Sequence, residues 1–108
     1  MKRIYLACPY TSDCKELVLS RVDAVNKLAA ELMDQGYCVF SPISHSHPIS
    51  EYTEADALNH NFWLEQDLEF MEWADEVWVY MLPGWKESKG IKRELEYAEK
   101  LGKVIEWI

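Results

Sequence analysis

The chain has 108 residues, 49% of them hydrophobic and 28% charged, which excludes a disordered linker and predicts a single domain over residues 1–108 with one core. Its net charge is −8, from 11 Lys and Arg against 19 Asp and Glu, so it lacks the basic stripe that a nucleic-acid polymer or an anionic membrane would require. We expect no membrane span and no secretory leader, because the apolar runs fall far short of ~20 residues.

The first half of the chain predicts two short strands around one long helix. Arg3–Ala7 is a β-prone run. From about Cys14 to Gln35, apolar residues recur with the spacing of an amphipathic helix, and Gly36 stands where a glycine would end it. The apolar stripe consists of Val18, Val22, Val25, Ala29 and Leu32. Tyr37–Phe40 predicts a second buried strand that ends at Ser41-Pro42.

The second half continues the alternation after a segment rich in small polar residues. Ser41–Asn59 predicts a long loop, and long loops in compact domains are usually functional. The remaining elements are a helix over about His60–Trp73, a strand over Glu76–Met81, a turn at Pro83-Gly84, a helix over about Lys89–Leu101 and a strand over Lys103–Trp107. This order predicts an α/β fold, a compact doubly wound (Rossmann- or flavodoxin-like) domain of three layers with a mainly parallel sheet of four or five strands.

In such a sheet, ligands bind beyond the carboxyl ends of the strands. The segments that follow the predicted strands there are Cys8–Ser12, Ser41–His47 and Leu82–Gly90. We therefore expect the functional site to be built from these three segments.

Two acidic residues fall on the apolar faces of the predicted helices. At about 100° per residue, Asp67 lies in the middle of an apolar sector, four residues after Trp63 and four before Met71. Glu94 lies on the same side of its helix as Ala98. Burying an unpaired carboxylate costs several kcal/mol, so each needs a partner, a proton or a catalytic function. A structural ion pair would explain either one alone, whereas the two together favour cleavage of a glycosidic bond.

Ser88, Lys89 and Gly90 open the last predicted helix. The free N–H groups and positive dipole of a helix N-terminus favour an anion, and the Ser88 hydroxyl adds a donor. The alternative is that Ser88 is a plain N-cap.

The histidines and cysteines do not predict a metal site. His45 and His47 form an H-x-H pair without a third ligand at a recognisable spacing, so we expect neither metal nor cofactor and interpret His45 as a substrate donor. The three cysteines form no CxxC pair, which predicts free thiols and a cytoplasmic protein. Trp85, next to the Pro83-Gly84 turn, could line a ligand pocket or a subunit contact.

Three motifs carry a resemblance to a known superfamily. The opening IYLACPYT resembles the "YLAGP" entry of nucleoside 2-deoxyribosyltransferase-like proteins. Glu65–Met81 is similar to the Asp-bearing helix and following strand of the 2′-deoxynucleoside 5′-phosphate N-hydrolase branch. Ser88–Lys103 looks like that branch's S-x-G-x-x-x-E-x-x-x-A segment. The stretch from about Ser44 to Asn59 is unmatched.

The resemblance implies a role for each matching residue. Glu94 would be the nucleophile that attacks the sugar C1′, and Asp67 would hold the sugar or base or pass a proton to the leaving base. Tyr5 would be the first-strand tyrosine of the pocket, and Ser88 would contact phosphate. Transferases of the superfamily tend to have an aspartate at the Ser88 position, which favours a nucleotide as ligand.

The loop after the first strand departs from the hydrolase pattern. The hydrolases have a loop rich in glycine and arginine there, whereas this chain has Cys8–Ser12, so phosphate binding is less firmly implied than the glutamate. Within this loop, Pro9 and Tyr10 are expected to contact substrate.

The sequence thus predicts an N-glycosidase that hydrolyses the base–sugar bond of a (deoxy)nucleoside 5′-monophosphate through a covalent glutamyl–sugar intermediate. One alternative is a nucleoside 2-deoxyribosyltransferase that exchanges bases. Another is a non-catalytic nucleotide-binding or sensing domain, which would need only the anion site and an aromatic wall. The expected partner is a small nucleotide or nucleoside, and the resemblance implies a homo-oligomer, dimer or higher, with the pocket at a subunit interface.

Overall fold

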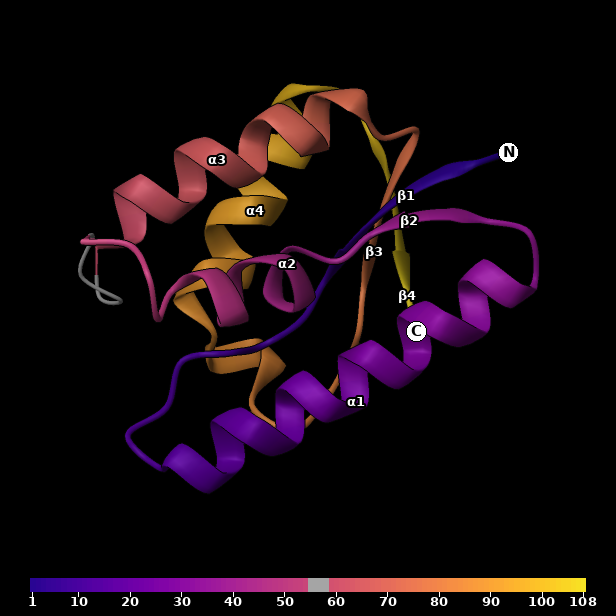
Figure 1. The fold of residues 1–108 in the computed structure, drawn as a ribbon. Coiled ribbons are helices and arrows are strands. Elements are labelled where there is room, and N and C mark those ends of the chain that lie inside the picture. The colour runs from indigo at the N-terminus through magenta and orange to yellow at the C-terminus, as the bar shows by residue number, and fades with distance from the viewer. Residues whose placement is uncertain (55–58) are drawn as a thin grey trace.

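The computed structural model describes residues 1–54 and 59–108 and contains one four-stranded sheet in the order β2-β1-β3-β4 (Figure 1). Each neighbouring pair of strands is parallel. The elements are β1 (Arg3–Ala7), α1 (Lys15–Asp34), β2 (Cys38–Phe40), α2 (Pro42–Ile49), α3 (His60–Trp73), β3 (Glu76–Val79), the 3₁₀ turn η1 (Trp85–Glu87), α4 (Lys89–Lys100) and β4 (Val104–Trp107). The predicted α/β architecture is confirmed.

The sheet lies between two helical layers, with α1 on one face and α3 and α4 on the other (Figure 1). Successive side chains of β1 alternate between these faces, as the period of a strand requires. Tyr5 packs into a cluster with Met71 of α3 and Ile91 of α4, whereas Leu6 packs into a cluster with Val25 of α1. Both faces of the central strand are therefore buried.

The predicted ends of α1 are confirmed. The helix begins directly after Cys14 and ends at Asp34. Gly36 follows with a φ of 98°, in the left-handed region that glycine adopts without strain.

The prediction of a loop over Ser41–Asn59 is wrong at its start, because Pro42–Ile49 forms α2. A proline at the first helical position lacks only an N–H group that would have no partner there, so Pro42 favours a helix start. At the two ends of this helix, His45 N–H donates a hydrogen bond to the Ser41 carbonyl (3.1 Å) and Ser50 N–H donates one to the Ser46 carbonyl (2.8 Å). Residues 55–58 of the predicted loop lie outside the described residues.

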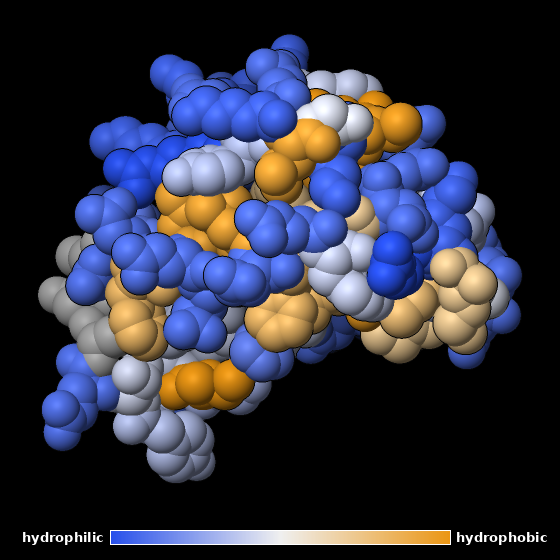
Figure 2. Space-filling view, turned by 90° about the horizontal axis from the view of Figure 1, so that it is seen from above, coloured by the Kyte–Doolittle hydropathy of each residue, from blue (hydrophilic) through white to orange (hydrophobic). Residues whose placement is uncertain are grey.

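The outer surface of α3 is acidic. Glu65, Glu69 and Glu72 are exposed, and the face seen from above is largely hydrophilic with separate hydrophobic patches (Figure 2). Phe70 is 36% exposed, although its ring stacks on that of Phe40 in the edge strand β2, with 3.9 Å between ring centroids. Among the described residues, no helix is both long enough and apolar enough to cross a bilayer.

The strand order places a crevice between two neighbouring strands. From β1 the chain crosses through α1 to β2 on one side, and from β2 it crosses back to β3 on the other side of β1. The segments that leave β1 and β3 therefore diverge to opposite faces of the sheet. This is the topological switch point, where open α/β sheets bind their ligands.

Candidate active site

A cavity of about 650 Å³ opens at this switch point, beyond the carboxyl ends of β1 and β3. Its wall includes residues of the loop after β1, of α2 and α3, and of the N-terminal half of α4. The predicted residues that line it are Pro9, Tyr10, Asp67, Ser88, Gly90 and Glu94. Four segments that are distant in the sequence thus meet at one site.

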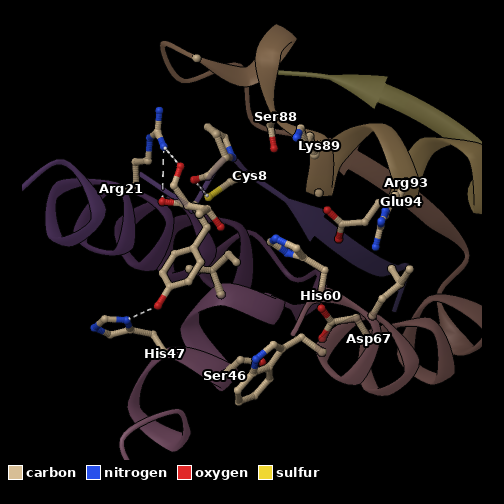
Figure 3. A pocket seen from close by; sticks show the side chains of 18 of the residues that line it. Cys8, Arg21, Ser46, His47, His60, Asp67, Ser88, Lys89, Arg93 and Glu94 are labelled. Carbon is tan, nitrogen blue, oxygen red and sulfur yellow. Dashed lines mark hydrogen bonds between the residues drawn. The ribbon is translucent and has the colours of Figure 1, made fainter. Parts of the chain in front are cut away.

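Glu94 is the buried carboxyl group of this cavity. It lies on α4, is 8% exposed, and points toward the cavity (Figure 3). The Tyr5 hydroxyl of β1 donates a hydrogen bond to Glu94 Oε2 from within the core. Burial raises the pKa of Glu94 to about 8, although the Tyr5 hydrogen bond opposes this and a negative charge on Asp67 adds to it. At neutral pH the folded protein therefore holds Glu94 largely protonated.

Asp67 supplies a second carboxyl group from α3. Its side chain points into the same cavity (Figure 3), where Trp63 and Leu64 make the neighbouring wall apolar. Burial raises the pKa of Asp67 to about 7. The cavity thus holds two carboxyl groups, from different helices, whose pKa values lie close to neutral pH. Such a pair can perform acid–base or nucleophilic chemistry.

The N-terminus of α4 forms another part of the wall. Ser88 is its N-cap, because the Ser88 hydroxyl accepts a hydrogen bond from Ile91 N–H (3.2 Å). The N-cap contact considered as the alternative is therefore present. Ser88, Lys89 and Gly90 also line the cavity. A Cβ atom added to Gly90 would meet only the Ser88 hydroxyl, at an ordinary 3.8 Å, so the protein itself does not require glycine there.

The loop after β1 is joined to α2 across the cavity. The Tyr10 hydroxyl and His47 Nδ1 lie 2.7 Å apart, and their rings meet edge to face. This bond fixes Tyr10 against the helix that the sequence did not predict. His47 therefore lines the cavity from α2.

Three predicted binding residues do not line this cavity. Tyr5 is fully buried in the core and reaches the site only through its hydrogen bond to Glu94, and the other two are His45 and Trp85. His45, two residues before His47, turns to the other side of α2, where its ring packs against Phe40 and Phe70. Trp85 packs against the core between the sheet and α4, with its ring 5.3 Å from that of Trp107. Neither is placed to contact a ligand beside Glu94.

Several lining residues were not predicted from the sequence. They include Arg21, Ser46, His60, Trp63 and Arg93. Arg21 could have been found by the pattern that singled out Asp67, because it lies three residues after Val18 and four before Val25, on the apolar stripe of α1. Arg21, Lys89 and Arg93 bring three cations to a cavity wall that also carries Glu87 and the two carboxyl groups, in a chain whose net charge is −8. Within the described part of the chain, no three His, Cys, Asp or Glu side chains are grouped to hold a metal ion.

The raised pKa of Glu94 predicts a pH-dependent stability. Because the folded protein holds a proton that the unfolded chain releases above about pH 4.5, the free energy of unfolding should fall as pH rises from there through about 8. The slope is up to about 1.4 kcal/mol per pH unit for this group. Glu94→Gln removes the effect, so the variant should unfold at a higher temperature than the parent at pH 8.5 and at a similar one near pH 4.5.

Thermal unfolding at the two pH values measures this, with Glu96→Gln as the matched control because Glu96 is exposed on the same helix. A stability difference between Glu94→Gln and the parent that stays constant with pH would contradict the assigned pKa.

Comparisons with known proteins agree with this architecture. The chain is similar to the solved 2-deoxyribosyltransferase of the psychrotolerant bacterium Bacillus psychrosaccharolyticus, with 27% identity and a TM-score of 0.71 over 97% of this chain and 70% of that one. The similarity confirms the resemblance to the nucleoside 2-deoxyribosyltransferase-like superfamily. No curated protein matches the chain. Residues 2–108 match one family over nearly their whole length, and the chain therefore belongs to the family described as a domain of unknown function, DUF1937.

Proposed function

We propose that this protein is an N-glycosidase that hydrolyses the base–sugar bond of a (deoxy)nucleoside 5′-monophosphate. The observation that carries the proposal is the presence of two carboxyl groups, Glu94 and Asp67, in one cavity. The fold similarity to a 2-deoxyribosyltransferase supports a reaction at the same type of bond. A binding domain would have no need of a buried and a half-buried carboxyl group that each cost stability.

In the first step, the Glu94 carboxylate attacks the sugar C1′ as the bond from C1′ to the base nitrogen breaks. The bonding electron pair leaves with the base, and the proton that Asp67 holds passes to the base. The products are the neutral free base, an ester between Glu94 and the sugar, and an Asp67 carboxylate. Splitting the reaction through a covalent intermediate replaces one difficult step by two easier ones.

This step needs Glu94 ionised and Asp67 protonated. Between pH 7 and 8 the two groups together hold about one proton, given pKa values of about 7 and about 8. The Tyr5 hydroxyl donates to Glu94 and so increases the share of the form in which the carboxylate is on Glu94 and the proton is on Asp67. This productive form is the smaller share, because Glu94 has the higher pKa of the two groups.

In the second step, water attacks C1′ and the bond between C1′ and the Glu94 oxygen breaks. The Asp67 carboxylate takes a proton from the water as it attacks. The sugar leaves with a free hydroxyl, and both carboxyl groups return to their starting forms.

The cavity wall favours an anionic substrate. Ser88 and the first N–H groups of α4 lie at the positive end of the helix dipole, and Lys89 and Arg93 add full charges to the same wall. A phosphate at this end of the cavity would receive charge-assisted hydrogen bonds, each worth about 1.5–3 kcal/mol. We therefore place the 5′-phosphate at the N-terminus of α4.

Base exchange is the second candidate function, and the similarity to a 2-deoxyribosyltransferase favours it. The same glutamyl–sugar ester would form, and a second base would attack C1′ in place of water. The serine at position 88, where the resemblance implies an aspartate in transferases, supports hydrolysis.

Incubation with a panel of nucleoside and deoxynucleoside 5′-monophosphates and their parent nucleosides tests the proposal, with free base followed by chromatography. We expect free base from a monophosphate without any added base, and a KM about tenfold or more higher for the matching nucleoside. New nucleosides that form only when a second base is added would identify a transferase instead. Tight binding of monophosphates without base release would identify a non-catalytic domain.

A further inference from the structure

Arg21 is a buried cation beside the cavity with an unusual environment. It lies on the inner face of α1 and is 8% exposed. It forms no ion pair within the described residues, and its buried Nε has no hydrogen-bond partner there. Burying a charge without an opposite charge is costly, so the guanidinium must be held by other polar contacts.

The guanidinium joins the two segments that follow β1 and β3. Nη1 donates to the carbonyls of Tyr10 (3.3 Å) and Thr11 (3.2 Å) in the loop after β1, and Nη2 donates to the carbonyl of Pro83 (3.1 Å) after β3. Figure 3 shows Arg21 on the opposite side of the cavity from Glu94, with its bonds to the first loop dashed. The planar fork of arginine suits three acceptors on two segments, which a lysine ammonium could not serve in the same way.

Gly84 makes room for this arrangement. A Cβ atom added there would lie 2.4 Å from Arg21 Nη2, closer than any real contact of this kind. Gly84 also has a φ of 96°, so a larger residue would be strained as well. The guanidinium can thus reach Pro83 only because the next residue has no side chain.

We propose that Arg21 is a positioning residue that clamps the loop after β1 to the segment after β3 and so fixes the distance between two walls of the cavity. One wall carries Pro9 and Tyr10, and the other leads through η1 into Ser88 at the start of α4. The coupling between the segments is a property of the fold. Its consequence for substrate binding rests on the proposed function.

NMR relaxation of the backbone amides tests the coupling without any substrate. Gly84→Ala should lower the order parameters of residues 10–12 from about 0.85, the value of rigid backbone, toward about 0.6, because displacing the guanidinium weakens the hydrogen bonds that hold the carbonyls of this loop. Gly36→Ala is the matched control: its φ of 98° imposes the same backbone strain, and a Cβ atom there meets nothing within 4 Å. Unchanged order parameters at residues 10–12 in Gly84→Ala would overturn the clamp.

Two substitutions of Arg21 separate the clamp from a role of charge alone. Arg21→Met keeps the aliphatic stem and loses the charge, whereas Arg21→Lys keeps the charge and loses the fork. We expect both to lower the backbone order parameters of residues 10–12 and to raise the KM for the monophosphate about tenfold, with kcat within a few-fold of the parent. Full rescue by lysine would overturn the clamp, because charge alone would then suffice.

The outcomes distinguish this inference from the proposed function. If the parent protein turns over a monophosphate but the Gly84 and Arg21 variants have its order parameters at residues 10–12 and bind substrate like it, the clamp is wrong and the function stands. If the parent releases no base while the order parameters change as expected, the proposed function is wrong and the clamp stands.

Discussion

Replacing Glu94 by glutamine should abolish base release while the protein stays folded. The amide has nearly the same shape as the carboxyl group, and its oxygen can still accept the hydrogen bond from Tyr5. It carries no negative charge, however, and cannot form the ester with the sugar C1′. Removing a nucleophile costs several orders of magnitude in rate. Release of free base from the preferred monophosphate, followed by chromatography, measures the loss.

Glu96→Gln provides the control, because it makes the same chemical change at an exposed position two residues further along α4. It should keep the parent rate. Turnover by Glu94→Gln close to that of the parent, with unchanged substrate binding, would rule out Glu94 as the nucleophile.

Replacing Asp67 by asparagine should lower kcat by about 10²–10⁴, the usual contribution of a general acid. The amide has no proton to give to the leaving base. A base that departs easily as an anion needs that proton less, so its release should be slowed less. Glu65→Gln, an exposed carboxylate on the same helix, is the control and should have no effect.

The pH profile distinguishes a proton donor from a residue that only shapes the cavity. In the parent, the rate should rise as Glu94 ionises, fall as Asp67 loses its proton, and peak between about pH 7 and 8. In Asp67→Asn the alkaline fall should vanish. The rising limb should move to lower pH, because a charged Asp67 no longer raises the pKa of Glu94. A variant that keeps the alkaline fall would show that another group donates the proton.

The main features of the fold could be predicted because apolar periodicity is strong in α1, α3 and α4. The same periodicity singled out Asp67 and Glu94, since a carboxyl group on an apolar face conflicts with burial unless it has a function. Both line the cavity. The local sequence was thus sufficient to find these two carboxyl groups, because what distinguishes them is their position on the apolar face of a single helix.

Features that depend on tertiary contacts could not be predicted in this way. The α2 segment contains Pro42, Pro48 and several serines, a composition typical of a loop, and packing against α1 and β1 outweighs it. Because this segment is helical, His47 faces the cavity, whereas His45, two residues earlier, faces the other side of α2. The position of Arg21 on an apolar stripe could be seen in the sequence. Its hydrogen-bond acceptors could not, because they are backbone carbonyls, which no side-chain pattern reveals.

The contact between Tyr5 and Glu94 has a consequence for how the protein matures. The two residues lie 89 positions apart, so their hydrogen bond can form only after the chain closes a loop that contains most of the sequence. A nascent or partly refolded chain that has formed only its local helices lacks this bond and the carboxyl arrangement around it. If Glu94 is the nucleophile, as proposed, such a chain would not yet cleave its substrate, and activity would begin only when the first strand and the last helix have met.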